Sequence, residues 1–313
     1  MKTFRYIPLF WLILFASCAK TPEIDDATML DGDRIFDLSL SQPENFLISA
    51  RYPVPDNEQK NIPVIIAAHG YSATTFEWDE LREYSDSTRT FLVSQVLLGG
   101  HGRSYQDFKE STWKDWQMSI RDEYEKLSDM GYKNIYLAGS STGCPLIINM
   151  VKSGFFDNLT KPNKIFLIDP IVVSSNKSLT LVSALGPVLG FAITEMTNGE
   201  QGKWYTYRPY QSLNQLMDLI DLTRKDLQAG ITLPEGSGLK TYKSISDGSA
   251  DPVSAVLIYR GMRNADGSKT EVEMVDSKLH VFTRLSGRDG VTTSDRALQM
   301  HVFREMESVM ISD

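Results

Sequence analysis

The sequence predicts an α/β fold in which a mostly parallel sheet is covered by helices on both faces. The first observation is a set of continuous apolar runs, each typical of a strand buried on both faces, at 64–68, 91–98, 134–138 and 164–168. The second is that amphipathic stretches separate these runs, as in chains whose strands and helices alternate. The third is that the runs end in glycine, histidine or aspartate, and ligands bind beyond the carboxyl ends of such strands.

The remaining elements are predicted from weaker or different patterns. Two shorter runs, 241–246 and 272–275, are candidates for two further strands. The clearest helix is 113–130, where apolar residues recur every three or four positions. Gly131 follows it directly and is predicted to cap its carboxyl end.

Composition limits the classes of protein to which the chain can belong. The chain has 313 residues, of which 42% are hydrophobic, enough for one large domain or a domain with an insertion. A formal net charge of −8 argues against a nucleic-acid partner, which would require a basic face. The sequence carries no phosphate loop, dinucleotide fingerprint or cysteine-based metal pattern, so we expect neither a cofactor nor a metal.

The N-terminus has the pattern of an export signal. Two basic residues precede the apolar run 7–15, and two small residues follow it, which predicts a signal peptide over residues 1–17. The next residue is Cys18, and its setting resembles the lipidation box of bacterial lipoproteins. We therefore expect an exported lipoprotein, anchored through a lipid on Cys18 on the periplasmic side or at the cell surface, with 18–45 as tether and entry segment. The alternative is plain secretion with an incidental cysteine.

Residues 171–212 interrupt the alternation of strands and helices. The segment combines many Ser, Thr, Gly and Asn residues with an apolar cluster at 179–189 and with aromatics at Trp204, Tyr205, Tyr207 and Tyr210. We predict a cap inserted over the site, which divides the core into 46–170 and 213–313. A long surface connection is the alternative, although so much apolar surface would be costly in water.

One short motif carries the chemistry. The run Gly139-Ser140-Ser141-Thr142-Gly143 has the form Gly-x-Ser-x-Gly, and it lies between a predicted strand and the predicted helix 144–152. A sharp strand-to-helix turn of this kind exposes its central serine, so Ser141 is the candidate nucleophile. The alternative is an ordinary glycine-containing turn with an idle serine.

A serine hydroxyl needs a base to remove its proton. Four histidines are available, and in this setting the base follows the nucleophile along the chain, which leaves His280 and His301. His280 lies just after the last predicted strand, where a loop can reach the nucleophile. His301 lies in a helical pattern and is better interpreted as a side chain of the final helix, so His280 is favoured.

The acid that orients the base has two candidates after the penultimate predicted strand. Asp251 is favoured because it precedes a proline and the helix-like run 253–259. Asp247 is nearer the strand end, but beside Gly248 it could be a turn residue. The choice between them stays open at this point; either would fix the tautomer of the histidine and stabilise its charged form.

A developing oxyanion requires two backbone N–H donors. One is expected from Thr142, which follows the nucleophile, and the other from Tyr71, in the loop after the first strand. His69 in that loop is then interpreted as a structural residue that shapes it.

Taken together, six segments give the chain a resemblance to bacterial monoacylglycerol lipases and carboxylesterases of the α/β-hydrolase superfamily: His69-Gly70-Tyr71, Gly100-His101-Gly102-Arg103-Ser104, Trp113-Lys114-Asp115-Trp116, Gly139 to Gly143, Asp251, and Ser277-Lys278-Leu279-His280-Val281. The resemblance implies a small cap over an acyl pocket. It also implies hydrolysis of acyl or lipid-like esters through an acyl-enzyme on Ser141. Two residues depart from the family pattern, because Thr142 replaces a common Met and Cys144 replaces a second Gly.

Two alternatives to ester hydrolysis remain. The same three residues could act on a peptide amide or a thioester, or transfer the acyl group to an alcohol. A lipoprotein that binds a ligand without catalysis would instead be expected to lack one member of the set.

Overall fold

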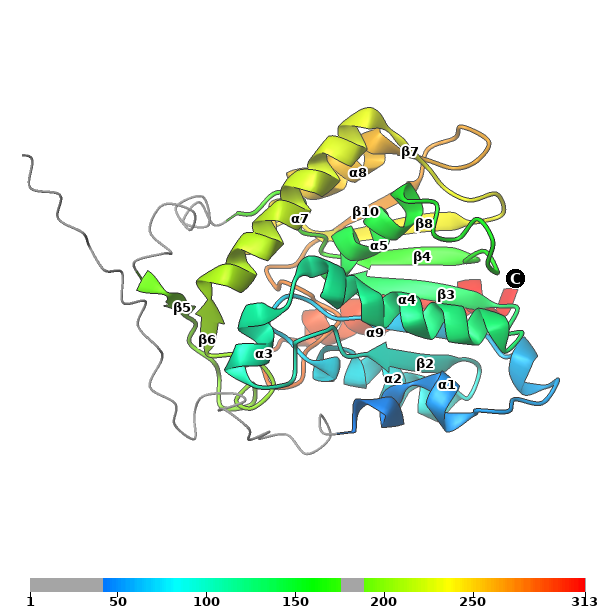
Figure 1. Ribbon diagram of the computed structural model, residues 1–313, viewed down its shortest axis with the longest axis horizontal. Coiled ribbons are helices and arrows are strands. Elements are labelled where there is room, and N and C mark those ends of the chain that lie inside the picture. Colours follow the sequence, from blue (N-terminus) through cyan, green and yellow to red (C-terminus); the bar gives the residue numbers. More distant parts are fainter. Residues whose placement is uncertain (1–41, 176–188, 313) are drawn as a thin grey trace, which may run out of the picture.

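A six-stranded, wholly parallel sheet forms the centre of the computed structural model, which describes residues 42–175 and 189–312 (Figure 1). Its strand order is β10-β8-β4-β3-β1-β2. The strands are β1 (Val64–Ala68), β2 (Leu92–Val96), β3 (Ile135–Ser140), β4 (Lys164–Ile168), β8 (Gly238–Ser244) and β10 (Glu271–Val275). All six predicted strands are therefore confirmed, as is the predicted fold class.

The continuous apolar runs form strands here because both faces of the sheet are covered. In β1 every residue is buried, and successive side chains enter opposite layers. Val64 and Ile66 pack in the core on one face, whereas Ile65 and Ala67 pack in the core on the other. An alternating polar pattern would have left one of these layers without its apolar contacts.

Helices cover the sheet in two layers. One layer contains α1 (Ile48–Arg51), α4 (Trp113–Asp129), α5 (Gly143–Lys152), α7 (Tyr210–Ala229) and α8 (Val253–Gly261). The other contains α2 (Asp79–Thr88) and α9 (Thr293–Ser312). The predicted helix 113–130 is confirmed as α4, which begins at a Thr112–Asp115 capping box. Gly131 follows its end with a φ of 84°, the conformation expected of a glycine cap.

Smaller elements complete the described chain. The short helix α3 (Tyr105–Glu110) contacts α7 and β6, and β7 (Ile231–Thr232) pairs with β9 (Met262–Arg263) in parallel. Three 3-10 turns lie at Pro43–Phe46, Gln59–Asn61 and Thr75–Trp78.

The described part of the predicted cap is a β-hairpin that lies beyond the carboxyl ends of the sheet strands (Figure 1). It pairs β5 (Phe191–Ile193) with β6 (Tyr207–Pro209) in antiparallel fashion. Residues 176–188 of the predicted cap lie outside the described residues. The predicted boundary at residue 212 falls inside α7, because that helix begins at Tyr210 and continues into the core layer.

Tyr205 fastens the cap to the loops of the core. Its hydroxyl accepts a hydrogen bond from the Arg103 amide at 3.2 Å, and it lies 3.0 Å from the Gly100 carbonyl oxygen. Its own amide donates to the Ser72 carbonyl oxygen at 3.1 Å. The cap therefore sits directly over the loops that follow β1 and β2.

The predicted signal peptide 1–17, Cys18 and most of the predicted tether lie outside the described residues. Among the helices of 42–175 and 189–312, none is both long enough and apolar enough to cross a membrane.

Candidate active site

Ser141 occupies the sharp turn between β3 and α5. Its φ is +48°, in the left-handed region that is costly for a residue with a Cβ. The turn is tight because the two flanking glycines approach other backbone atoms: a Cβ on Gly139 would lie 2.7 Å from the Gly143 carbonyl carbon, and one on Gly143 would lie 2.4 Å from the Ala68 oxygen. The predicted strand–turn–helix setting is thus present, with the serine only 7% exposed.

His280 lies in the loop after β10 and faces the serine. Its Nε2 is 2.8 Å from the Ser141 Oγ, which is hydrogen-bonding distance. The loop is held in an unusual backbone conformation, because Val281 has a φ of +54° although it is β-branched. Arg288 donates a hydrogen bond to the His280 carbonyl oxygen and so also restrains this loop.

The carboxylate that contacts the histidine belongs to Asp247. Its Oδ2 lies 2.7 Å from the His280 Nδ1, so the preference for Asp251 is wrong and the alternative holds. Asp251 instead accepts the Val253 amide at 2.8 Å at the start of α8, which is a helix-capping role. Asp247 is the turn residue that its neighbour Gly248 suggested, since its Oδ1 accepts the amides of Ser249 and Ala250. Asp247 therefore has both roles: its Oδ1 stabilises the turn, and its Oδ2 contacts the histidine.

A buried ion-pair network supports this carboxylate. The Lys243 Nζ lies 2.6 Å from the Asp247 Oδ2 and 3.0 Å from Asp169, and all three side chains are fully buried. Burial alone would raise the pKa of Asp247, but the hydrogen bonds and charges of His280 and Lys243 outweigh it and lower this pKa to about 2. Sequence reasoning missed Lys243 and Asp169, because a lysine in a strand ordinarily faces solvent.

Because Asp247 is ionised, the direction of the hydrogen bonds from Ser141 to His280 and from His280 to Asp247 is fixed. An ionised carboxylate can only accept, so the His280 Nδ1 carries the proton and donates it to Asp247. The lone pair of Nε2 then faces the Ser141 hydroxyl, which donates to it. A serine in this arrangement can lose its proton to the imidazole as it attacks an electrophile.

The two predicted oxyanion donors line one cavity with the serine and the histidine. Tyr71 and Thr142 both contribute to its wall. Neither backbone amide donates to another group within the part of the chain that the structure describes. The Tyr71 side chain is fixed by a 2.6 Å hydrogen bond between its hydroxyl and the Ser212 Oγ, so its backbone is held in place.

The other histidines have the structural positions expected of them. His69 is fully buried, its Nε2 accepts the Leu98 amide at 3.1 Å, and its Nδ1 donates to the Gly70 carbonyl oxygen at 2.8 Å. Burial lowers the pKa of His69 to about 4, which keeps it neutral. His301 lies on α9 with 60% of its side chain exposed, as the preference for His280 implied.

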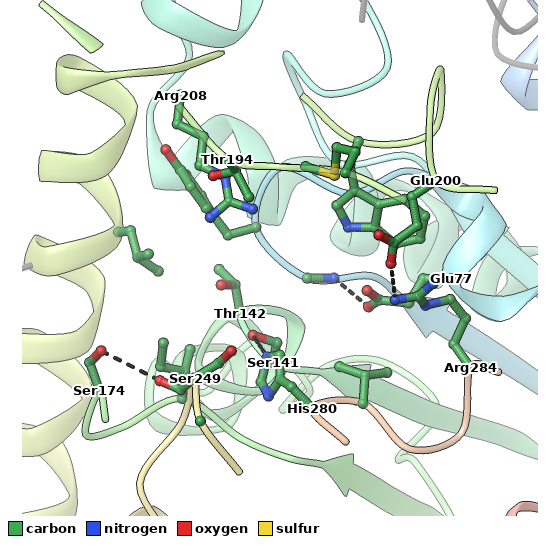
Figure 2. A pocket seen from close by; sticks show the side chains of 18 of the residues that line it. Glu77, Ser141, Thr142, Ser174, Thr194, Glu200, Arg208, Ser249, His280 and Arg284 are labelled. Carbon is green, nitrogen blue, oxygen red and sulfur yellow. Dashed lines mark hydrogen bonds and ion pairs between the residues drawn. The ribbon is translucent and has the colours of Figure 1, made fainter. Parts of the chain in front are cut away.

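The cavity above Ser141 has a volume of about 350 Å³ and a more charged wall than the sequence suggested (Figure 2). Its apolar lining includes Trp204 from the cap and Leu213 and Leu216 from α7. The charged side chains in its wall are Glu77, Glu195, Glu200, Arg208, Arg284 and Arg288. Sequence reasoning missed this set, because it comes from three separate segments of the chain.

Two groups of side chains in the described residues have the composition of a metal site: Asp169, Asp247 and His280, and the surface group Glu273, His301 and Glu305. In each group a lysine already neutralises the carboxylates. Lys243 bonds both aspartates of the first, and Lys240 bonds both glutamates of the second. A divalent cation would have to displace these ammonium groups, so neither group fits a resident metal well.

Comparisons with known proteins find similarity to an esterase family and to a lipase. Residues 19–143 match the model of the acetyl xylan esterase family (AXE1). The thermostable monoacylglycerol lipase of Bacillus sp. (strain H-257) is 27% identical over 110 residues, which cover 34% of this chain and 43% of that enzyme. The matched segment therefore spans less than half the length of that curated relative.

Solved structures resemble a larger part of the chain. A structure from work on the metagenome-derived lipolytic enzymes LipS and LipT has a TM-score of 0.63 at 16% identity, covering 81% of this chain and 95% of its own. A soluble variant of monoglyceride lipase from Saccharomyces cerevisiae has a TM-score of 0.62 at 13% identity, covering 82% of this chain and 88% of its own. The monoacylglycerol lipase of Paleococcus ferrophilus has a TM-score of 0.58 at 12% identity, with coverages of 80% and 96%. The predicted α/β-hydrolase fold and the resemblance to lipases and esterases are thereby confirmed.

Proposed function

We propose that this α/β hydrolase cleaves carboxylic esters through an acyl-enzyme on Ser141. The observation that carries the proposal is the continuous chain of hydrogen bonds from Ser141 to His280 and from His280 to Asp247, at 2.8 Å and 2.7 Å. Its members lie at the carboxyl ends of three different strands, where catalytic groups of such sheets gather. The esterase and lipase relatives support the same reaction class.

In the proposed mechanism, the Ser141 oxygen attacks the ester carbonyl carbon while His280 takes the hydroxyl proton. The tetrahedral intermediate collapses, the alcohol leaves with the proton from His280, and the acyl group stays on Ser141. Water, activated by the same imidazole, then attacks the acyl-enzyme and releases the acid. Asp247 remains ionised and stabilises the imidazolium in both halves of the reaction.

The backbone amides of Tyr71 and Thr142 would donate hydrogen bonds to the negatively charged oxygen that develops from the ester carbonyl. Both lie in the wall of the Ser141 cavity, and no backbone acceptor among the described residues occupies them. Donors fixed in advance stabilise the intermediate more than the substrate, because charge develops only in the intermediate.

The test is covalent labelling with a fluorophosphonate, followed by mass mapping of the modified residue. We expect the label on Ser141, and we expect Ser141→Ala to lose both labelling and hydrolysis of short p-nitrophenyl esters. The control is Ser87→Ala, an exposed serine on α2, which should retain both. Unchanged labelling of Ser141→Ala would refute the assignment of the nucleophile.

The same three residues could also act on an amide or a thioester, or transfer the acyl group to an alcohol. A panel of matched ester, thioester and aminoacyl amide substrates, with and without added alcohol, separates these reactions. A ligand-binding protein without catalysis is the least favoured alternative, because all three side chains are present and aligned.

We further propose that the chain is an exported bacterial lipoprotein, with a lipid on Cys18 that holds it to a membrane on the periplasmic side or at the cell surface. The sequence before and at Cys18 supports this. We expect Cys18→Ser to move the protein from the membrane fraction to the soluble fraction and to abolish incorporation of radioactive palmitate. Equal palmitate incorporation in both forms would overturn the proposal.

A further inference from the structure

The Ser141 cavity has an excess of hydrogen-bond donors without partners. Among the described residues, four buried side-chain atoms that lack a partner belong to residues of its wall: the Oγ1 of Thr142 and the Nε atoms of Arg208, Arg284 and Arg288. Each arginine nitrogen can only donate. Buried donors normally have partners, because a donor without one destabilises the fold, so this wall is suited to a ligand rich in acceptors.

Two of these arginines have other partners that define their roles. Arg284 forms an ion pair with Glu200 at 2.7 Å and also donates to the Ser286 carbonyl oxygen. Arg288 donates to the carbonyl oxygens of His280 and Val281. Both guanidinium groups therefore serve to hold the cap and the histidine loop.

Arg208 differs from them, because its guanidinium has no hydrogen bond or ion pair with a described residue. It makes a cation–π contact instead, because the Arg208 Cζ lies 5.7 Å from the centroid of the Tyr71 ring. Arg208 comes from β6 of the cap, and Figure 2 shows its guanidinium pointing into the cavity on the side opposite Ser141, with Thr142 between them. A cation is thus held across the cavity from the nucleophile.

The negative groups around the cavity do not neutralise Arg208 directly. Glu77 accepts the Gly70 amide and the Ser140 hydroxyl, and Glu200 is paired with Arg284. Glu195 is an exposed residue of the cavity wall and forms no ion pair with Arg208. The positive charge of Arg208 therefore remains available to a ligand.

We propose that the ester substrate carries a carboxylate, which pairs with the Arg208 guanidinium while the ester carbonyl lies at Ser141. A guanidinium matches a carboxylate with two parallel hydrogen bonds, so the pair would both bind the substrate and orient it. This inference rests on the proposed ester hydrolysis and specifies its substrate class. The carboxylate can belong to the acyl part or to the alcohol part of the ester.

The experiment uses two pairs of esters that differ in one charge. p-Nitrophenyl hydrogen adipate and p-nitrophenyl hexanoate test the acyl part, and 4-acetoxybenzoate and methyl 4-acetoxybenzoate test the alcohol part. We expect wild-type protein to prefer the charged member of one pair in kcat/KM. Arg208→Met should reduce that preference at least 30-fold, with most of the change in KM, and Arg208→Lys should restore part of it.

The control variant is Arg224→Met, which removes an exposed arginine of α7 whose one ion-pair partner among the described residues is Asp221, and it should keep the preference. If Arg208→Met does not fold, inhibition of the wild-type enzyme by adipate and by neutral adipamide decides instead, and adipate should inhibit at least tenfold more strongly. Equal use of charged and neutral esters, or equal inhibition, overturns the inference. Failure of the esterase proposal is distinct, because then no ester is cleaved and Ser141 is not labelled.

Discussion

At the scale of single residues, Asp247 joins two tasks that the sequence seemed to divide between two aspartates. One oxygen closes the turn after β8 by accepting two amides, and the other accepts from His280 and Lys243. The turn thus fixes the carboxylate in the direction that the imidazole needs. Because the Asp247 side chain is already ordered, little entropy is lost in holding the histidine.

Replacing each of the two aspartates, Asp247 and Asp251, by asparagine in turn tests which one assists His280. We expect Asp247→Asn to lower kcat by about 10,000-fold, because an amide favours the wrong histidine tautomer. Asp251→Asn is the matched control, since asparagine also caps helices and should change kcat less than threefold. Steady-state kinetics on a p-nitrophenyl ester measure both variants. A larger loss of kcat in Asp251→Asn than in Asp247→Asn would contradict the assignment of Asp247 as the partner of the histidine.

The sequence predicts those site residues whose positions follow from a short local motif or from the end of a strand. Gly139 to Gly143 between a strand and a helix predicts Ser141, and the position after the last strand predicts His280. The choice of acid fails because the direction of a carboxylate depends on backbone turns, which spacing does not reveal. Lys243 could not be predicted, because a lysine in a strand ordinarily faces solvent, whereas this one is fully buried beside Asp247 and Asp169. Arg208 could not be predicted, because the cavity that it lines is built from segments distant in sequence.

At the scale of elements, the contacts of Tyr205 attach the cap to α3 and to the loop after β2 and not to a strand of the main sheet. Tyr205 of the cap is buried, its ring stacks on Phe108 of α3 at 4.3 Å, and its hydroxyl contacts the loop after β2. Four of the six parallel strands were predictable from continuous apolar runs and two from weaker patterns, whereas the short β5–β6 hairpin has no comparable pattern. Its position depends on a few specific contacts of this kind.

Removing the Tyr205 hydroxyl should loosen the cap without unfolding the core. We expect Tyr205→Phe to lower stability by about 1–2 kcal/mol and to speed amide exchange in residues 189–209. Tyr207→Phe is the control, because the Tyr207 hydroxyl makes no hydrogen bond with a described residue. Hydrogen exchange followed by mass spectrometry measures the change, and equal exchange in the two variants would show that Tyr205 does not anchor the cap.

At the scale of the whole molecule, buried and paired carboxylates tie stability to pH. The pKa of Asp247 is lowered to about 2, despite its burial, by its partners His280 and Lys243. The pKa of Glu200 is lowered by Arg284, again against the effect of burial. Groups of this kind stabilise the folded state fully above their unfolded pKa, near 4. That stabilisation is lost as the pH falls toward the folded pKa.

We therefore expect a specific loss of stability in acid. The difference in the free energy of unfolding between wild type and Asp247→Asn should shrink by about 2 kcal/mol as the pH falls from 5 toward 2. Urea denaturation at several pH values measures it. Two curves that fall in parallel would mean that Asp247 is not held ionised in the folded protein.

The attachment of the cap to the histidine loop limits how this protein can be re-engineered. The Thr197 hydroxyl donates to the Gly287 carbonyl oxygen at 2.5 Å, and Glu200 pairs with Arg284 in the same loop. Gly199 and Gly287 also approach so closely that a Cβ on Gly199 would lie 2.5 Å from the Gly287 Cα. We therefore expect that replacing the cap alone would displace His280, the proposed base, unless residues 281–290 were replaced together with it.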